Sequence, residues 1–72
     1  MLNAFKLARE LDGLRQRDLQ LATGLNKAII SAIETGRIRP SRKEATRLIG
    51  ALPSYKKAVE MLNFARSGGN EF

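Results

Sequence analysis

Apolar residues recur along the chain at helical spacing, and glycine and proline residues separate the apolar runs. In the first run, Phe5, Ala8 and Leu11 lie three residues apart, and Asp12 and Gly13 follow directly. Glycine readily takes the left-handed conformation that ends many helices, so the first helix is predicted to stop here. The alternation of apolar and polar residues that marks a half-buried strand does not occur in the sequence.

Two short helices are predicted next, with only a few residues between them. The first covers Gln16 to Thr23, carries Leu19 and Ala22 three residues apart, and stops at Gly24. The second runs from about Asn26 to Thr35, and its asparagine is a candidate N-cap because the side chain can accept a backbone N–H. The apolar stripe of this second helix consists of Ile29, Ile30 and Ile33.

Ser41 and Glu44 have the spacing of a capping box, in which each side chain accepts a backbone N–H at the start of a helix. The fourth helix is predicted to begin here, with a buried face made of Ala45, Leu48, Ile49 and Leu52. A fifth helix is predicted after Pro53 and Ser54, with Tyr55, Ala58, Val59, Leu62 and Ala65 on one face. Residues 67–72 are expected to form a flexible C-terminal tail. The pattern therefore predicts an all-α fold, a compact five-helix domain over residues 1–66.

Composition narrows the chemistry that this domain can perform. The 72 residues include no cysteine and no histidine, which removes disulfides, thiolate nucleophiles and the commonest metal ligands. The seven carboxylates are scattered and form no recognisable acid–base pair, so we expect no enzyme, metal, cofactor or small-molecule ligand. No apolar run approaches the roughly 18 residues of a membrane span, and no signal-peptide core is visible. We expect a cytoplasmic protein without a membrane partner.

The charge balance is strongly basic. Thirteen Lys and Arg residues against seven Asp and Glu residues give a formal charge of +6, which favours an anionic partner. A stretch of seven residues without an acid holds four cations: Arg37, Arg39, Arg42 and Lys43. A solvated charged surface would look the same if this were the only signal.

The second and third predicted helices have the geometry of a helix-turn-helix, which is two short helices joined by about three residues around a glycine. The major groove of B-DNA admits one α-helix, which must be anchored on one side and exposed on the other. Ile30 and Ile33 suit the anchored side. The outward positions, which are small or polar, are Asn26, Lys27, Ala28, Ser31 and Ala32. An ordinary amphipathic helix would show the same division.

Four fragments in order carry a family resemblance: Leu14-x-Gln16-x-x-Leu19, Gly24-Leu25-Asn26, Ile30-x-x-Ile33-Glu34-x-Gly36 and Arg39-Pro40-Ser41. Each fragment is weak alone, whereas their order and spacing are fairly specific. Over about residues 5–52, the chain resembles the Cro and lambda-repressor-like (XRE) helix-turn-helix family. The resemblance implies a lambda-repressor-like fold and a partner that is double-stranded DNA.

The resemblance also implies roles for residues of the helix-turn-helix. Gln16 would contact a phosphate and brace the reading helix. Four residues would face the bases: Asn26, Lys27, Ala28 and Ser31. Asparagine suits adenine, lysine suits the guanine acceptors and alanine suits the thymine methyl group. Lys27 fits a phosphate contact equally well, and Ile29 fits either the core or a contact with sugar and methyl groups.

The basic residues would bind the DNA backbone. Arg37, Arg39, Arg42 and Lys43 would lie beside the groove, aided by the amino end of the fourth helix. Arg9 and Glu34 occupy the places of a structural ion pair in this family. Two departures affect the pose: Gln20 replaces a small alanine, which predicts a looser crossing of the second and third helices, and Arg15 replaces the usual Ser or Thr N-cap. Arg15 and Arg17 would instead add phosphate contacts.

One reading helix covers only a few base pairs, so useful specificity normally requires a dimer on half-sites about 34 Å apart. Met61 and Phe64 extend the apolar surface of the fifth helix beyond its main stripe and are the candidate dimer interface, although they fit core packing nearly as well. The sequence therefore predicts a Cro-like phage or prokaryotic repressor that binds a palindromic operator as a homodimer. An antitoxin-type protein-binding module that also binds DNA is the alternative.

Overall fold

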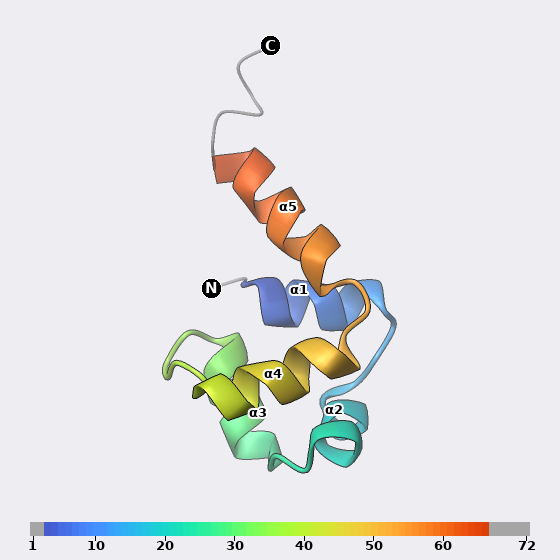
Figure 1. Cartoon of the computed structure of the whole chain (residues 1–72), viewed down its shortest axis with the longest axis vertical. Helices are drawn as coiled ribbons and strands as arrows, with labels where there is room; N and C mark the ends of the chain where they lie inside the picture. Colours follow the sequence, from blue (N-terminus) through green and yellow to red (C-terminus); the bar gives the residue numbers. More distant parts are fainter. Residues whose placement is uncertain (1–2, 67–72) are drawn as a thin grey trace.

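The computed structural model describes residues 3–66 as five helices joined by short connections (Figure 1). The helices are α1 (Ala4–Leu11), α2 (Gln16–Thr23), α3 (Lys27–Glu34), α4 (Arg42–Ala51) and α5 (Tyr55–Arg66). The predicted all-α, five-helix fold is thus confirmed. The tail predicted at residues 67–72 lies outside the described residues.

Local side-chain chemistry sets the helix boundaries close to where the sequence predicts them. Asn26 is the N-cap of α3, and Ser41 and Glu44 form the predicted capping box at the start of α4. At α2, the Arg15 side chain offers no acceptor, and the carboxylate of Asp18 instead accepts the N–H of Arg15 at 2.8 Å. Half of a capping box therefore begins α2 without the usual Ser or Thr.

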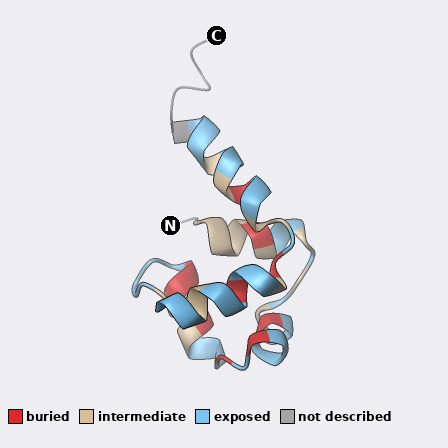
Figure 2. Ribbon diagram, in the orientation of Figure 1, coloured by how far each residue is buried: buried red, intermediate tan, exposed pale blue. Residues whose placement is uncertain are grey.

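The core lies where α1, α2, α3 and α4 face one another, and Ala58 at the start of α5 joins it, as the buried segments in Figure 2 show. Its large buried side chains are Leu19, Ile30, Ile33, Leu48 and Leu52. The fifth helix packs on α1, where the rings of Phe5 and Tyr55 stand 5.1 Å apart between centroids. Beyond this contact α5 projects away from the other four helices (Figure 1).

Four positions predicted to lie on apolar faces are exposed instead. Ile49 is 42% exposed, because the core contact of α4 is narrow and is made by Leu48 and Leu52. Ala22 is exposed because α2 turns its neighbour Thr23 inward, where the hydroxyl donates to the carbonyl of Leu19 at 2.6 Å. The other two lie at helix ends, Leu11 in the last turn of α1 and Ala65 on the projecting part of α5.

Asp12 fastens the end of α1 to the beginning of α5. Its carboxylate accepts the backbone N–H of Ser54 at 3.2 Å, and the Ser54 hydroxyl donates to the other carboxylate oxygen. A residue predicted only to end a helix therefore also helps to set the direction of α5.

Candidate nucleic-acid interface

The connection between α2 and α3 consists of Gly24, Leu25 and Asn26. Gly24 has φ +76°, a left-handed conformation that a side chain would strain, and its N–H donates to the carbonyl of Gln20. Leu25 is buried in the core, and its N–H donates to the hydroxyl of Thr23 at 3.2 Å. This anchored turn fixes the angle between the two helices. Gln20 itself is exposed.

The third helix divides into an anchored side and an outer side. Ile30, Ile33 and Glu34 are buried, and Ile29 is half-buried against the core, which favours the core alternative for this residue. The outer side carries the predicted base-reading residues. Asn26, Lys27 and Ala28 are exposed and Ser31 is half-buried. The helix therefore combines the anchoring and the small, polar outer side that entry into a major groove requires.

The geometry of Asn26 narrows its predicted role. Its Oδ1 accepts the N–H of Ile29 at 2.8 Å, which is the N-cap contact of α3. A bidentate contact with adenine uses the amide oxygen as well as the amide nitrogen. Because the cap occupies the oxygen, the side chain chiefly presents the donors of Nδ2 to a partner.

A buried ion pair braces the end of α3. Arg9 Nε donates to Glu34 Oε2 at 2.7 Å, and Nη2 donates to Oε1 at 3.0 Å, so the pair is bidentate. The Arg9 side chain is 14% exposed and that of Glu34 only 2%, and the hydrogen bond to Glu34 raises the pKa of Arg9. Arg9 Nη1 also donates to the carbonyl of Leu14. One arginine thus links α1, the α1–α2 connection and α3.

Gln16 joins the same carboxylate from the second helix. Its Nε2 donates to Glu34 Oε1 at 3.1 Å, so the predicted bracing contact is present in the structure. An amide nitrogen has two hydrogens, and one of them is engaged by Glu34. The second hydrogen leaves room for the predicted phosphate contact, which stays a prediction.

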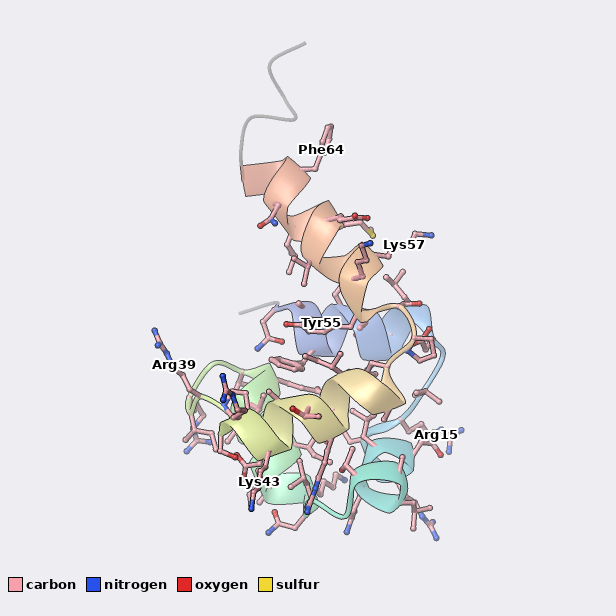
Figure 3. The ribbon with its side chains drawn as sticks, in the orientation of Figure 1. Arg15, Arg39, Lys43, Tyr55, Lys57 and Phe64 are labelled. Carbon is pink, nitrogen blue, oxygen red and sulfur yellow. The ribbon has the colours of Figure 1, made fainter. Side chains whose placement is uncertain are left out.

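The predicted backbone-binding cations all lie on the surface, on both sides of the α2–α3 unit. Arg39 extends from the connection between α3 and α4, and Arg15 lies at the start of α2 (Figure 3). The connection between α3 and α4 is bound to the end of α3, because the N–H groups of Arg37 and Ile38 both donate to the carbonyl of Ala32. The exposed cations of this region are Arg15, Arg17, Arg37, Arg39, Arg42 and Lys43.

Four acidic side chains of the described residues accept hydrogen bonds or form an ion pair within the protein. Asp18 and Glu44 accept N–H groups at the starts of α2 and α4, Glu34 pairs with Arg9, and Asp12 binds Ser54. The cations near α3 are exposed, whereas these carboxylates satisfy backbone and side-chain donors. The exposed cations near α3 are therefore available to an external anion.

Two exposed residues beside this surface were not singled out from the sequence. Ile38 is 45% exposed between Arg37 and Arg39, and Arg47 is exposed one turn after Lys43 on α4. The spacing of four residues from Lys43 to Arg47 is a signal that could have found the arginine. An isoleucine in a loop gives no such signal.

The fifth helix carries a second exposed surface. Met61 is 43% exposed and Phe64 60%, and these two residues line a shallow hollow together with Lys57 and Glu60. Phe64 projects from the distal part of α5, away from the other helices (Figure 3). Core packing, the alternative for this pair, is therefore not what the structure has.

Within residues 3–66, no helix is long and apolar enough to cross a membrane, and no group of three His, Cys, Asp or Glu side chains is placed to hold a metal ion. A family model described as helix-turn-helix matches residues 5–57, which is most of the chain and includes the whole α2–α3 unit. Comparisons with curated proteins and with solved structures gave no match.

Proposed function

Because the chain belongs to the XRE-type helix-turn-helix family of DNA-binding transcriptional regulators, we propose that it is a repressor that binds a palindromic operator as a homodimer. The observation that carries the proposal is the two-sided character of α3. Ile30, Ile33 and Glu34 hold the helix to the body, while Lys27 and Ala28 stand exposed on the other side.

Base reading is assigned to the outer side of α3. Lys27 reaches guanine acceptors or a phosphate, Ala28 packs on a thymine methyl group, and Ser31 bonds a base edge. Asn26 contributes the donors of its amide nitrogen, since its oxygen caps the helix. These contacts are few, so they select sequence more than they supply affinity.

Affinity is assigned to the surrounding cations. Arg37, Arg39, Arg42 and Lys43 are exposed beside α3, and each phosphate that they neutralise releases condensed counterions. Arg15 and Arg17 extend the same contact from α2, and Gln16 adds a neutral donor. Binding of this kind weakens steeply with salt, and it fixes the register of the protein without reading sequence.

The homodimer is assigned to α5. One reading helix covers too few base pairs to find a unique operator, and a dimer doubles the contacts with two half-sites. Met61 and Phe64 offer exposed apolar surface on a helix that projects from the body. Lys57 and Glu60 flank this surface with opposite charges, which suits an antiparallel pair of α5 helices. Such a dimer represses by occupying an operator that overlaps a promoter.

A binding selection from random duplexes tests the proposal directly. The expected result is an enriched site with two inverted half-sites whose centres are separated by about 34 Å, or one turn of B-DNA. Affinity for the selected site should also fall steeply with salt. A selection that enriches no sequence, or binding that does not respond to salt, would contradict the proposal.

An antitoxin-type protein-binding module that also binds DNA is the second candidate. The exposed Met61 and Phe64 favour it too, because an apolar helix face suits a different protein as well as a second copy. Mass measurement by sedimentation separates the candidates. A stable dimer of the purified chain favours the homodimeric repressor, and a monomer at micromolar concentration favours the module.

A further inference from the structure

The side chain of Asn3 binds the ends of two helices at once. Its Oδ1 accepts the N–H of Lys6 at 3.0 Å and so caps the start of α1. Its Nδ2 donates to the carbonyl of Ile33 at 2.6 Å, in the last turn of α3. The two partners of this single amide lie at the start of one helix and at the end of another.

Few residues other than asparagine can make both contacts from this position. The cap requires an acceptor, whereas a bond to the Ile33 carbonyl, which also accepts the N–H of Gly36 at 3.1 Å, requires a donor. A carboxylate offers only acceptors, and a serine hydroxyl is too short to span two helix ends. The amide of Asn3 supplies its oxygen to α1 and its nitrogen to α3. The orientation of the amide group follows, because one partner is a donor and the other is an acceptor.

A second contact between α1 and α3 lies directly beside the bond from Asn3 to Ile33. Arg9 binds the carboxylate of Glu34, the residue directly after Ile33. The first helix therefore holds the last turn of α3 at two adjacent residues, through a backbone carbonyl and through a side chain. The burial of Ile30 and Ile33 holds α3 against the core, and these two attachments on adjacent residues further restrict the rotation of the helix about its axis.

We propose that Asn3 is a positioning residue for the reading helix: its bond to the Ile33 carbonyl sets the rotation of α3 and thereby the direction in which Lys27, Ala28 and Ser31 point. This inference rests on the proposed DNA-binding function. Rotation of α3 displaces base-reading atoms but leaves the cations between α3 and α4 free to reach phosphates. Loss of the bond therefore lowers discrimination between sequences more than it lowers general affinity.

Two substitutions break the bond to Ile33 while keeping an acceptor for the α1 cap: Asn3→Ser, whose hydroxyl is too short to reach the carbonyl, and Asn3→Asp, which has no donor. Serine leaves the net charge unchanged, and aspartate also places a carboxylate near the Ile33 carbonyl. Affinities for a selected operator and for a random duplex are measured at one salt concentration. We expect the ratio of the two affinities to fall about 3- to 10-fold, the size of one lost hydrogen bond, with the larger fall for Asn3→Asp.

Ala4→Gly is the matched control, because it weakens α1 through the low helix propensity of glycine while leaving both bonds of Asn3 in place. We expect this variant to lower the thermal midpoint without changing the affinity ratio. The inference is overturned if both Asn3 variants keep the wild-type ratio within twofold, or if Ala4→Gly lowers the ratio as much at an equal loss of thermal midpoint. Failure of the wild-type chain to bind either duplex would overturn the proposed function as well, and that failure is visible before any variant is made.

Discussion

Arg9 of α1 and Glu34 of α3 form a bidentate ion pair in which the carboxylate is almost completely buried. Removal of the arginine would leave the negative charge of Glu34 buried, with Gln16 as its remaining side-chain donor. The buried carboxylate of Glu34 would destabilise the core if it were unpaired. Paired with Arg9, it connects the first helix to the reading helix.

We expect Arg9→Met to lower the free energy of unfolding by about 3 kcal/mol, because a stranded buried charge is costly. Urea denaturation followed by circular dichroism measures the change. Arg17→Met is the control, since Arg17 is exposed and its loss should change stability by no more than about 0.5 kcal/mol. Equal stabilities of the two variants would contradict the structural role of the pair.

The stability that the pair supplies should not vary across neutral pH. The hydrogen bond to Glu34 raises the pKa of Arg9 above its already strongly basic value. A raised pKa in the folded state gives stability that is fully present below the unfolded pKa and is lost as pH rises through the folded one. Because the pKa of Arg9 lies far above neutral pH in both states, the difference in unfolding free energy between wild type and Arg9→Met, measured by urea titration, should be constant from about pH 7 to pH 9. A fall in this difference within the range would contradict the assignment.

A third prediction separates capping from base reading at Asn26. Asn26→Asp keeps an oxygen for the N–H of Ile29 but removes the donors of Nδ2, so stability should be retained while preference at one base position changes. Asn26→Ala loses the cap, which should lower stability by about 1 kcal/mol. Thermal unfolding and a repeated binding selection give the two readouts. An unchanged selected sequence for Asn26→Asp would show that Asn26 only caps the helix.

Helix ends were predictable because their chemistry is local. Gly24 takes a conformation that few other residues tolerate, and Ser41 and Glu44 satisfy backbone groups three residues apart, so the sequence shows both signals directly. Which apolar residues are buried was less predictable. Ile49 has suitable spacing but is exposed, because the width of a buried face depends on the neighbouring helices rather than on the helix itself.

The candidate site was also predictable only in part. The pairing of Arg9 with Glu34 followed from the family resemblance, and the exposure of Lys27 followed from helical periodicity. The bond from Asn3 to Ile33 spans 30 residues and involves a backbone carbonyl, which carries no sequence signal. Contacts of this kind become visible only when the helices are placed in space.

A fourth prediction separates the two classes of DNA contact. Ser31→Ala removes an uncharged group from the outer side of α3 and should alter sequence preference without changing the salt dependence of binding. Arg39→Ala should weaken binding to all sequences alike and reduce the slope of log affinity against log salt by about 1. Titrations of the selected site and a random duplex over a range of salt measure both effects. Identical behaviour of the two variants would refute the division.

A fifth prediction concerns the exposed face of α5. Phe64 is 60% exposed on a helix that projects from the body, so burial in a dimer would remove a large apolar surface from water. Phe64→Asp would place a charge in that interface and should convert a dimer into a monomer at micromolar concentration, as sedimentation velocity measures. Leu21→Asp is the matched control, because Leu21 is also strongly exposed but lies on α2, and this variant should sediment as the wild type does. The affinity of Phe64→Asp for a single half-site should stay close to that of the wild type, since the reading helix is unchanged. Loss of half-site binding together with loss of the dimer would place Phe64 in the fold rather than in the interface.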